Sequence, residues 1–161
     1  MAVREGGTQA SLRDIARRAD VGMGTLYRHF PSREALLEQL MRRRFGHLAK
    51  RAGELGEGAE PVGALAAWLV EFAYGSGAYR GLPGEIIATL ADESSALQPA
   101  CADLRSAAQR LLAAAQAAGG IRPDLTADEL FALASAVAWI AEQTPAPRER
   151  LLELILSGLR A

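Results

Sequence analysis

Apolar residues recur at helical spacing along almost the whole chain. In the first such segment they stand at i, i+3, i+4 and i+7, at Leu12, Ile15, Ala16 and Ala19. This spacing places them on one face of a helix. Ser11, followed three residues later by Asp14, resembles a capping box with the shorter acid. The pattern predicts a short helix that begins at about Leu12.

A second short helix and a long third one follow. Asp20-Val21-Gly22 interrupts the first helix, and the same spacing then returns at Met23, Leu26, Tyr27 and Phe30. Pro31 ends that helix, and Ser32 can cap a long helix that we expect to reach about Ala52. Residues 53–60 are rich in glycine and acid. We therefore predict two domains, a head over residues 1–53 and a body over residues 54–161.

The body also has a helical pattern. Apolar stripes and breakers predict helices over about 61–75, 85–92, 99–118, 126–143 and 148–159. Thr126 with Glu129 forms a capping box, and Gly119-Gly120 closes the helix before it. Residues that favour strands are few, so the predicted fold class is all-α.

Apolar residues wrap widely around the last two predicted helices. One subunit cannot easily bury so broad an apolar surface, whereas a partner subunit can. We therefore predict a homodimer whose interface contains Leu130, Leu133, Ala134, Val137, Ala138, Ala141, Leu151, Leu152, Ile155 and Leu159.

The net charge of −1 conceals an asymmetry. Residues 1–53 hold 11 Lys and Arg against 5 Asp and Glu, a balance of +6, and residues 54–161 hold 7 against 14, a balance of −7. A basic head on an acidic body indicates an anionic partner for the head, most commonly a nucleic-acid backbone.

Several function classes lack support. The single cysteine cannot close an internal disulfide, and two histidines make a zinc site unlikely, so we expect no metal and no cofactor. No nucleophile and base stand at a motif spacing, and no glycine-rich phosphate loop is present, which argues against an enzyme. Without a signal core or a long apolar run, we expect a cytoplasmic protein with no membrane partner.

Residues 12–30 can form a DNA-reading helix-turn-helix. Such a unit needs a second helix that fits the major groove, braced by the first. Ile15, Ala16, Val21 and Leu26 would pack the two helices together. Thr25, Arg28 and His29 would then project outward, where planar or short polar side chains can reach base edges.

The string LRDIARRADVGMGTLYRHFPSREALLEQL closely resembles the head of the tetracycline-repressor (TetR) family. The match is carried by the tail of the motif, Tyr27, Phe30, Pro31, Ser32, Arg33 and Glu34. The resemblance implies a ligand-responsive transcriptional repressor that binds double-stranded operator DNA as a homodimer. It implies a helix-turn-helix head followed by a helical bundle for ligand binding and dimerisation.

The resemblance also assigns roles in the head. Thr25, Arg28 and His29 would read bases, Tyr27 and Arg33 would hold phosphates, and Gly24 would let the helix approach the groove. Met23 stands where the family commonly has lysine and could touch a thymine methyl group. The full set of DNA-binding residues is Ser11, Arg13, Met23, Gly24, Thr25, Tyr27, Arg28, His29 and Arg33.

A ligand pocket in the body would be largely apolar. The residues expected to line it for a small effector are Trp68, Phe72, Ile86, Leu90, Cys101, Leu104 and Trp139. For any one of them, plain core packing is the more common role.

The family places a further helix before the capping serine. This chain begins ten residues before Ser11, so we expect most of that helix to be missing and the head to be an incomplete three-helix unit. An alternative function follows, a dimerising interaction protein of the same family that no longer binds DNA.

Overall fold

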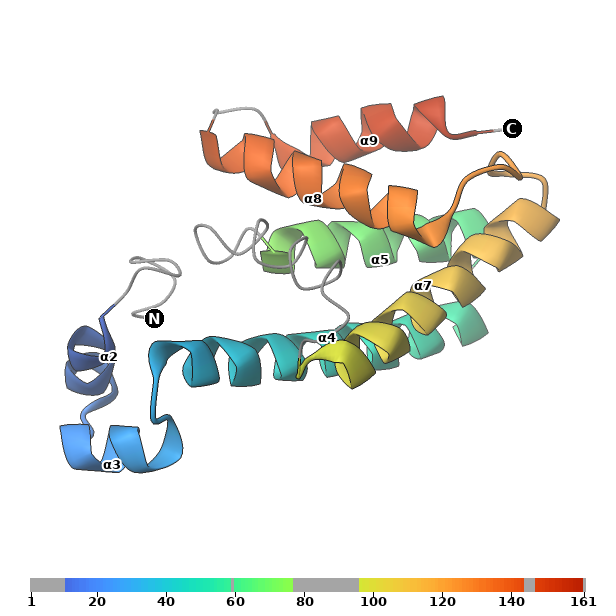
Figure 1. Ribbon diagram of the computed structural model, residues 1–161. Helices are drawn as coiled ribbons and strands as arrows, with labels where there is room; N and C mark the ends of the chain where they lie inside the picture. Colours follow the sequence, from blue (N-terminus) through green and yellow to red (C-terminus); the bar gives the residue numbers. More distant parts are fainter. Residues whose placement is uncertain (1–10, 59, 77–95, 144–146, 161) are drawn as a thin grey trace.

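The computed structural model describes residues 11–58, 60–76, 96–143 and 147–160. All regular structure in these ranges is α-helical, which confirms the predicted fold class. Two short helices lie at one end of the long helix α4, and the remaining helices gather along the rest of it (Figure 1). The predicted helix over 85–92 and the first ten residues lie outside the described ranges.

The head begins with helix α2 (Leu12–Ala19), whose cap forms as the sequence predicts. The Asp14 N–H donates to Ser11 Oγ at 3.1 Å, and the Ser11 hydroxyl donates to the Asp14 carboxylate at 2.8 Å. Asp20 ends the helix in the left-handed region, with φ of 53°. Its N–H and that of Val21 return to the last turn, which turns the chain sharply towards the next helix.

Helix α3 (Met23–His29) follows from Gly22 and ends at Phe30, directly before Pro31. Leu26 is its one buried side chain, and Ala16 is the one buried side chain of α2. The two helices pack on each other through this pair of positions.

Helix α4 (Arg33–Gly58) is longer than the sequence predicts. Ser32 begins it, since the Ala35 N–H donates to Ser32 Oγ at 3.1 Å. The expected end at Ala52 is wrong by six residues, because packing holds the glycine-containing last turns. Ala52 is buried, and a Cβ at Gly56 would lie 3.6 Å from Leu111 of the facing helix. Tertiary contact here outweighs the low helix propensity of glycine.

The body consists of α5 (Pro61–Ser76), α7 (Gln98–Ala117), α8 (Ala127–Gln143) and α9 (Arg148–Gly158). Helix α5 is central, with α4 and α7 on one side and α8 and α9 on the other (Figure 1). It is apolar almost all round, as a helix enclosed by neighbours should be.

Both predicted signals at the ends of the body helices are confirmed. Gly119 has φ of +70° and closes α7 in the left-handed conformation. Gly120 lies against Val62 so closely that an added Cβ would stand 2.2 Å from its Cγ2. At the start of α8, the Thr126 backbone N–H donates to the Glu129 carboxylate at 2.8 Å. The Glu129 backbone N–H donates to the Thr126 hydroxyl oxygen at 3.2 Å.

The hydrophobic core runs between α4, α5, α7 and α8. Its largest fully buried side chains are Phe45, Leu48, Leu65, Trp68, Leu69, Phe72, Leu104, Leu112, Ile121 and Leu130. A second, smaller cluster joins α5, α8 and α9 through Ala73, Val137 and Leu152 respectively.

Candidate functional site

The outer face of α3 presents most of the predicted DNA-reading residues. Thr25, Arg28 and His29 are exposed, as is Gly24, where an added Cβ would meet nothing within 4 Å. Tyr27 is 49% exposed, so its hydroxyl is available to a phosphate and not enclosed in a core. Buried Leu26 on the opposite face fixes the orientation of this surface.

Four other predicted contact residues flank this surface. Met23 and Arg33 are half-buried, at the first turns of α3 and α4 respectively, and Arg13 is exposed on α2. The Ser11 hydroxyl is engaged as the cap of α2. Its role in the structure is therefore to start the helix. This role leaves at most one lone pair of the Ser11 hydroxyl oxygen for a contact in a DNA groove.

Four of the predicted effector residues come together in the body. Trp68, Phe72, Cys101 and Leu104 are all fully buried and belong to one core cluster. Burial raises the pKa of the Cys101 thiol, which keeps it a protonated, weakly reactive apolar group. Ile86 and Leu90 lie outside the described residues.

Trp139 differs from its predicted place. It lies on the outer side of α8 and is 54% exposed, away from Trp68 and Phe72. The sequence shows two apolar stripes on α8, and only packing against α5 decides which of them faces inward. Phe131 takes the inner position, with its ring centroid 5.8 Å from that of Trp68 and 5.3 Å from that of Phe72.

Ser135 is a residue that the sequence analysis missed. It stands one turn beyond Phe131 on the same side of α8 and is completely buried. Within the described part of the chain its hydroxyl oxygen has no hydrogen-bond partner. The signal was present, since Ser135 is the one hydroxyl residue in an otherwise apolar stretch of that helix.

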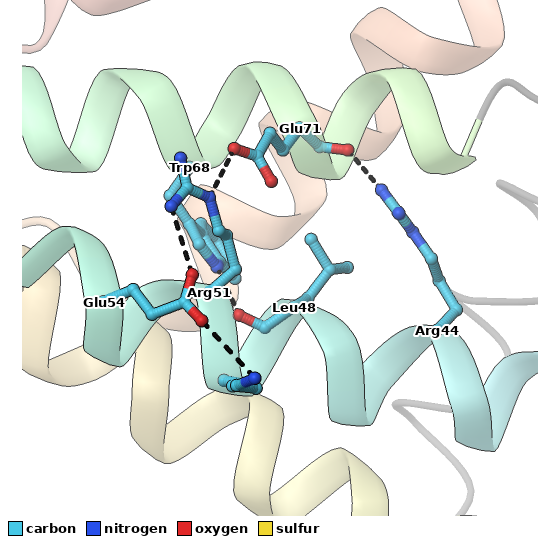
Figure 2. A network of polar contacts seen from close by, with 7 residues as sticks. Arg44, Leu48, Arg51, Glu54, Trp68 and Glu71 are labelled. Atoms are coloured by element: carbon cyan, nitrogen blue, oxygen red, sulfur yellow. Dashed lines mark hydrogen bonds and ion pairs between the residues drawn. The ribbon is translucent and has the colours of Figure 1, made fainter.

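A polar network joins α4 to α5 (Figure 2). Arg51 Nε donates to the Glu71 carboxylate at 2.8 Å, and Arg51 Nη1 lies 3.2 Å from Glu54. The Glu71 hydrogen bond is the main cause that raises the pKa of Arg51, and Arg51 in turn lowers the pKa of Glu54. Arg44 Nη2 donates to the backbone carbonyl of Glu71.

The same junction contains a buried hydrogen bond. The Trp68 indole N–H donates to the Leu48 carbonyl at 2.9 Å, and both side chains are buried. None of these α4–α5 contacts follows from local spacing, because each joins residues 20 or more apart in sequence.

The residues predicted for a dimer interface divide into two groups. Five are already buried within this chain and five are half-buried. The buried ones are Leu130, Ala134, Val137, Ala138 and Leu152, and the half-buried ones are Leu133, Ala141, Leu151, Ile155 and Leu159. The large apolar side chains that α8 and α9 leave exposed are Trp139, Ile140 and Leu154.

A separate cavity of about 380 Å³ lies at the turn between α7 and α8 and extends to the end of α9. Arg122 and Asp124 on its rim pair with each other at 2.6 Å. The cavity does not include the buried aromatic cluster.

None of the helices over residues 11–58, 60–76, 96–143 and 147–160 combines the length and apolar character that a membrane span requires. Over the same ranges, no three His, Cys, Asp or Glu side chains gather as a metal-binding group.

Two family models match this chain. One, described as bacterial regulatory proteins of the tetR family, matches residues 2–40. The other, described as the C-terminal domain of SbtR-like transcriptional regulators, matches residues 60–161. The first covers the head and the second covers the body.

Individual proteins agree with these matches. Over 59 residues the chain is 42% identical to the HTH-type transcriptional repressor KstR of Rhodococcus jostii (strain RHA1), a match to 36% of this chain and only 27% of that protein. A TetR transcriptional regulator from Streptomyces coelicolor is 37% identical, with a TM-score of 0.72 over 99% of this chain and 92% of that one.

A TetR transcription regulatory protein from Mycobacterium vanbaalenii is 28% identical, with a TM-score of 0.62 over 99% of this chain and 91% of that one. The matches are transcriptional regulators, so the prediction of a regulator and not an enzyme is confirmed at the level of the family.

Proposed function

Because this chain belongs to the TetR family of bacterial transcriptional regulators, we propose that it represses transcription from an operator that it releases on binding a small effector. Regulators of this family bind operator DNA, dimerise and bind small-molecule effectors. The observation that carries the proposal is the exposed face of α3, where Thr25, Tyr27, Arg28 and His29 are exposed while Leu26 is buried. A cytoplasmic location, where the DNA lies, is part of the proposal.

In this proposal α3 enters the major groove. Thr25, Arg28 and His29 read base edges, because hydroxyl, guanidinium and imidazole groups can pair with the donors and acceptors displayed there. Tyr27 and Arg33 bind phosphates, which positions the head without selecting a sequence. Arg33 lies in the first turn of α4, where the helix dipole also favours an anion.

The dimer forms through the outer faces of α8 and α9. Trp139 and Leu154 are each more than half exposed, an unusual arrangement for large apolar side chains on adjacent helices. The half-buried residues of the original prediction, such as Leu151 and Ile155, belong to the same pair of helices and supply the margin of the interface. In a symmetric dimer, α3 of the second subunit would lie about 34 Å from α3 of the first, a separation of one turn of DNA.

The effector enters the apolar region between α5, α7 and α8. Trp68, Phe72, Cys101 and Leu104 give this region its apolar walls. Ser135 adds a buried hydroxyl that has no hydrogen-bond partner among the described residues, and an unpaired buried hydroxyl costs roughly 1–3 kcal/mol. An apolar effector with one neutral hydrogen-bonding group would satisfy Ser135, whereas a charged group would need an opposite charge there.

The test of DNA binding begins with selection of duplexes from a random library by the purified protein in about 100 mM salt. Tyr27→Phe and Arg33→Gln should weaken binding to every selected duplex. Thr25→Ala and Arg28→Ala should instead change which sequences are selected, at about 1–3 kcal/mol per lost base contact. Equal effects from all four variants would overturn the assigned roles, and a failure to enrich any duplex would favour the interaction protein without DNA binding.

The test of the dimer compares a charged substitution on α9 with the same substitution on α7. Leu154→Glu places a charge in the proposed interface and should give monomers by analytical ultracentrifugation. Ser106→Glu places the same charge at an exposed position of α7, outside the two helices of the proposed interface, and serves as the control. If Leu154→Glu remains as dimeric as the control, the interface lies elsewhere.

A further inference from the structure

Helix α5 holds α4 by polar contacts along a single stripe. Arg44, Leu48 and Arg51 stand at i, i+4 and i+7, so they share one face of α4. Each of them receives or donates a hydrogen bond at Trp68 or Glu71 of α5, two residues that are themselves one turn apart (Figure 2). The contacts therefore fix both the rotation and the axial position of α4 at this point.

Trp68, on α5, contacts two other helices, α4 and α8, with one side chain. Its indole N–H donates to the Leu48 carbonyl of α4 at 2.9 Å. Its ring stacks on Phe72 of α5, with centroids 5.7 Å apart, and meets the edge of Phe131 of α8 at 5.8 Å. Any molecule that displaces this ring must move the Leu48 carbonyl with it or leave a buried N–H unpaired, at a cost of roughly 1–3 kcal/mol.

The two halves of α4 are held differently. From Arg33 to Leu40 no residue is buried, and Met41 is the first buried one. The helix is continuous from the head to Leu48, a length of about 22 Å at about 1.5 Å per residue. A tilt of about 5° at Leu48 would therefore move the head end by about 2 Å.

We propose that Trp68 is the positioning residue that couples the effector region to the DNA-reading head, through its bond to Leu48, while the Arg51–Glu71 ion pair keeps α4 in register on α5. This inference rests on the proposed function and names the residues that would transmit the effect of effector binding to the head. Coupling free energy is reciprocal, so if a ligand at Trp68 changes the affinity of the head for DNA, bound DNA must change the affinity for that ligand by the same factor and therefore alter the state of Trp68. The test therefore needs no knowledge of the effector.

The experiment follows the indole N–H signals by NMR in protein labelled with ¹⁵N-tryptophan. The chain has two tryptophans, and the signal lost in Trp68→Phe identifies Trp68. The probe is the duplex selected by the wild-type protein. Saturation with this duplex should shift the Trp68 signal and change the exchange rate of its N–H with solvent.

Glu71→Gln is the informative variant. It removes the ion pair to Arg51 but leaves the Glu71 backbone carbonyl that Arg44 uses. Because this pair is about one-third exposed, its loss should cost little stability, and the variant should fold. We expect the duplex-induced shift of Trp68 to fall to less than about half, while duplex affinity changes less than the roughly fivefold lower limit of typical allosteric coupling.

Lys50→Gln is the matched control, since Lys50 pairs with Glu54 within α4 and does not reach α5. It should retain the wild-type shift, and Arg51→Gln should reproduce the effect of Glu71→Gln. If the Trp68 signal does not shift when duplex binds, or if it shifts equally in Glu71→Gln and wild type, the inference is overturned. The proposed function is not affected by either result. Absence of any duplex binding would overturn the proposed function and this inference with it.

Discussion

The head and the body of this protein are stabilised in different ways. In residues 11–32 only Ala16 and Leu26 are buried, and the Ser11 side chain caps the start of α2. The body instead encloses a continuous core in which four helices share aromatic and aliphatic contacts. Within the described residues, the proposed DNA-reading unit therefore has few buried side chains, whereas the body to which it is attached has many.

This difference suits a regulator. A face that must adapt to a DNA groove gains from low local stability, whereas a coupling element must transmit small displacements without absorbing them. Helix α4 belongs to both, half-buried at Leu36 and Leu40 and deeply packed at Phe45 and Leu48.

The largest expected effect on stability comes from truncating one buried side chain in the body and one in the head. Phe131→Ala should lower the free energy of unfolding of the body by about 3–5 kcal/mol, because it empties a site packed against Trp68 and Phe72. Leu26→Ala should unfold the head and leave the body transition, followed in urea by the fluorescence of the two body tryptophans, Trp68 and Trp139, close to wild type. Equal shifts from both variants would show that head and body unfold as one cooperative unit.

A matched pair of caps gives the intermediate effect. Ser11→Ala in the head and Thr126→Ala in the body each remove a side-chain acceptor from the start of a helix, worth about 1 kcal/mol. Hydrogen exchange should show the loss confined to α2 in the first variant, whereas the second should lower the stability of the whole body. Ser157→Ala is the control, since the Ser157 hydroxyl only donates to the Leu154 carbonyl within α9. Loss of protection beyond α2 in Ser11→Ala would contradict the local character of the head.

The smallest effect is a pH dependence. Hydrogen bonds from its own N–H and from Ser32 lower the pKa of Glu34, and bonds from the backbone and hydroxyl of Thr126 lower the pKa of Glu129. A carboxyl whose pKa is lower in the folded state stabilises that state above its ordinary value of 4.5, and this contribution is lost as the pH falls further.

Glu129→Gln should therefore flatten the loss of body stability between neutral pH and acid, measured by urea unfolding. Glu34→Gln should do the same for the first turn of α4, measured by hydrogen exchange. Glu57→Gln, at an exposed position late in α4, is the control for a general charge effect. An unchanged acid slope in Glu129→Gln would show that its capping contacts do not depend on charge.

The sequence by itself determined what depends on residues within about four positions of one another. Periodic apolar residues specified the helices, Thr126 with Glu129 specified the start of α8, and Gly119 specified the end of α7. The motif from Leu12 to Leu36 specified which side chains of α3 face outward, because burying Leu26 leaves Thr25 and Arg28 no other direction.

Only the tertiary structure decided the rest. It carried α4 through its glycines to Gly58, since α7 packs along it, and it turned Phe131 inward and Trp139 outward on a helix with two apolar stripes. It also brought Trp68 to Leu48 and Arg51 to Glu71 across 20 residues of sequence. Such contacts depend on how whole helices cross, and helix crossing is set by the combined packing of all of them and by no local pattern.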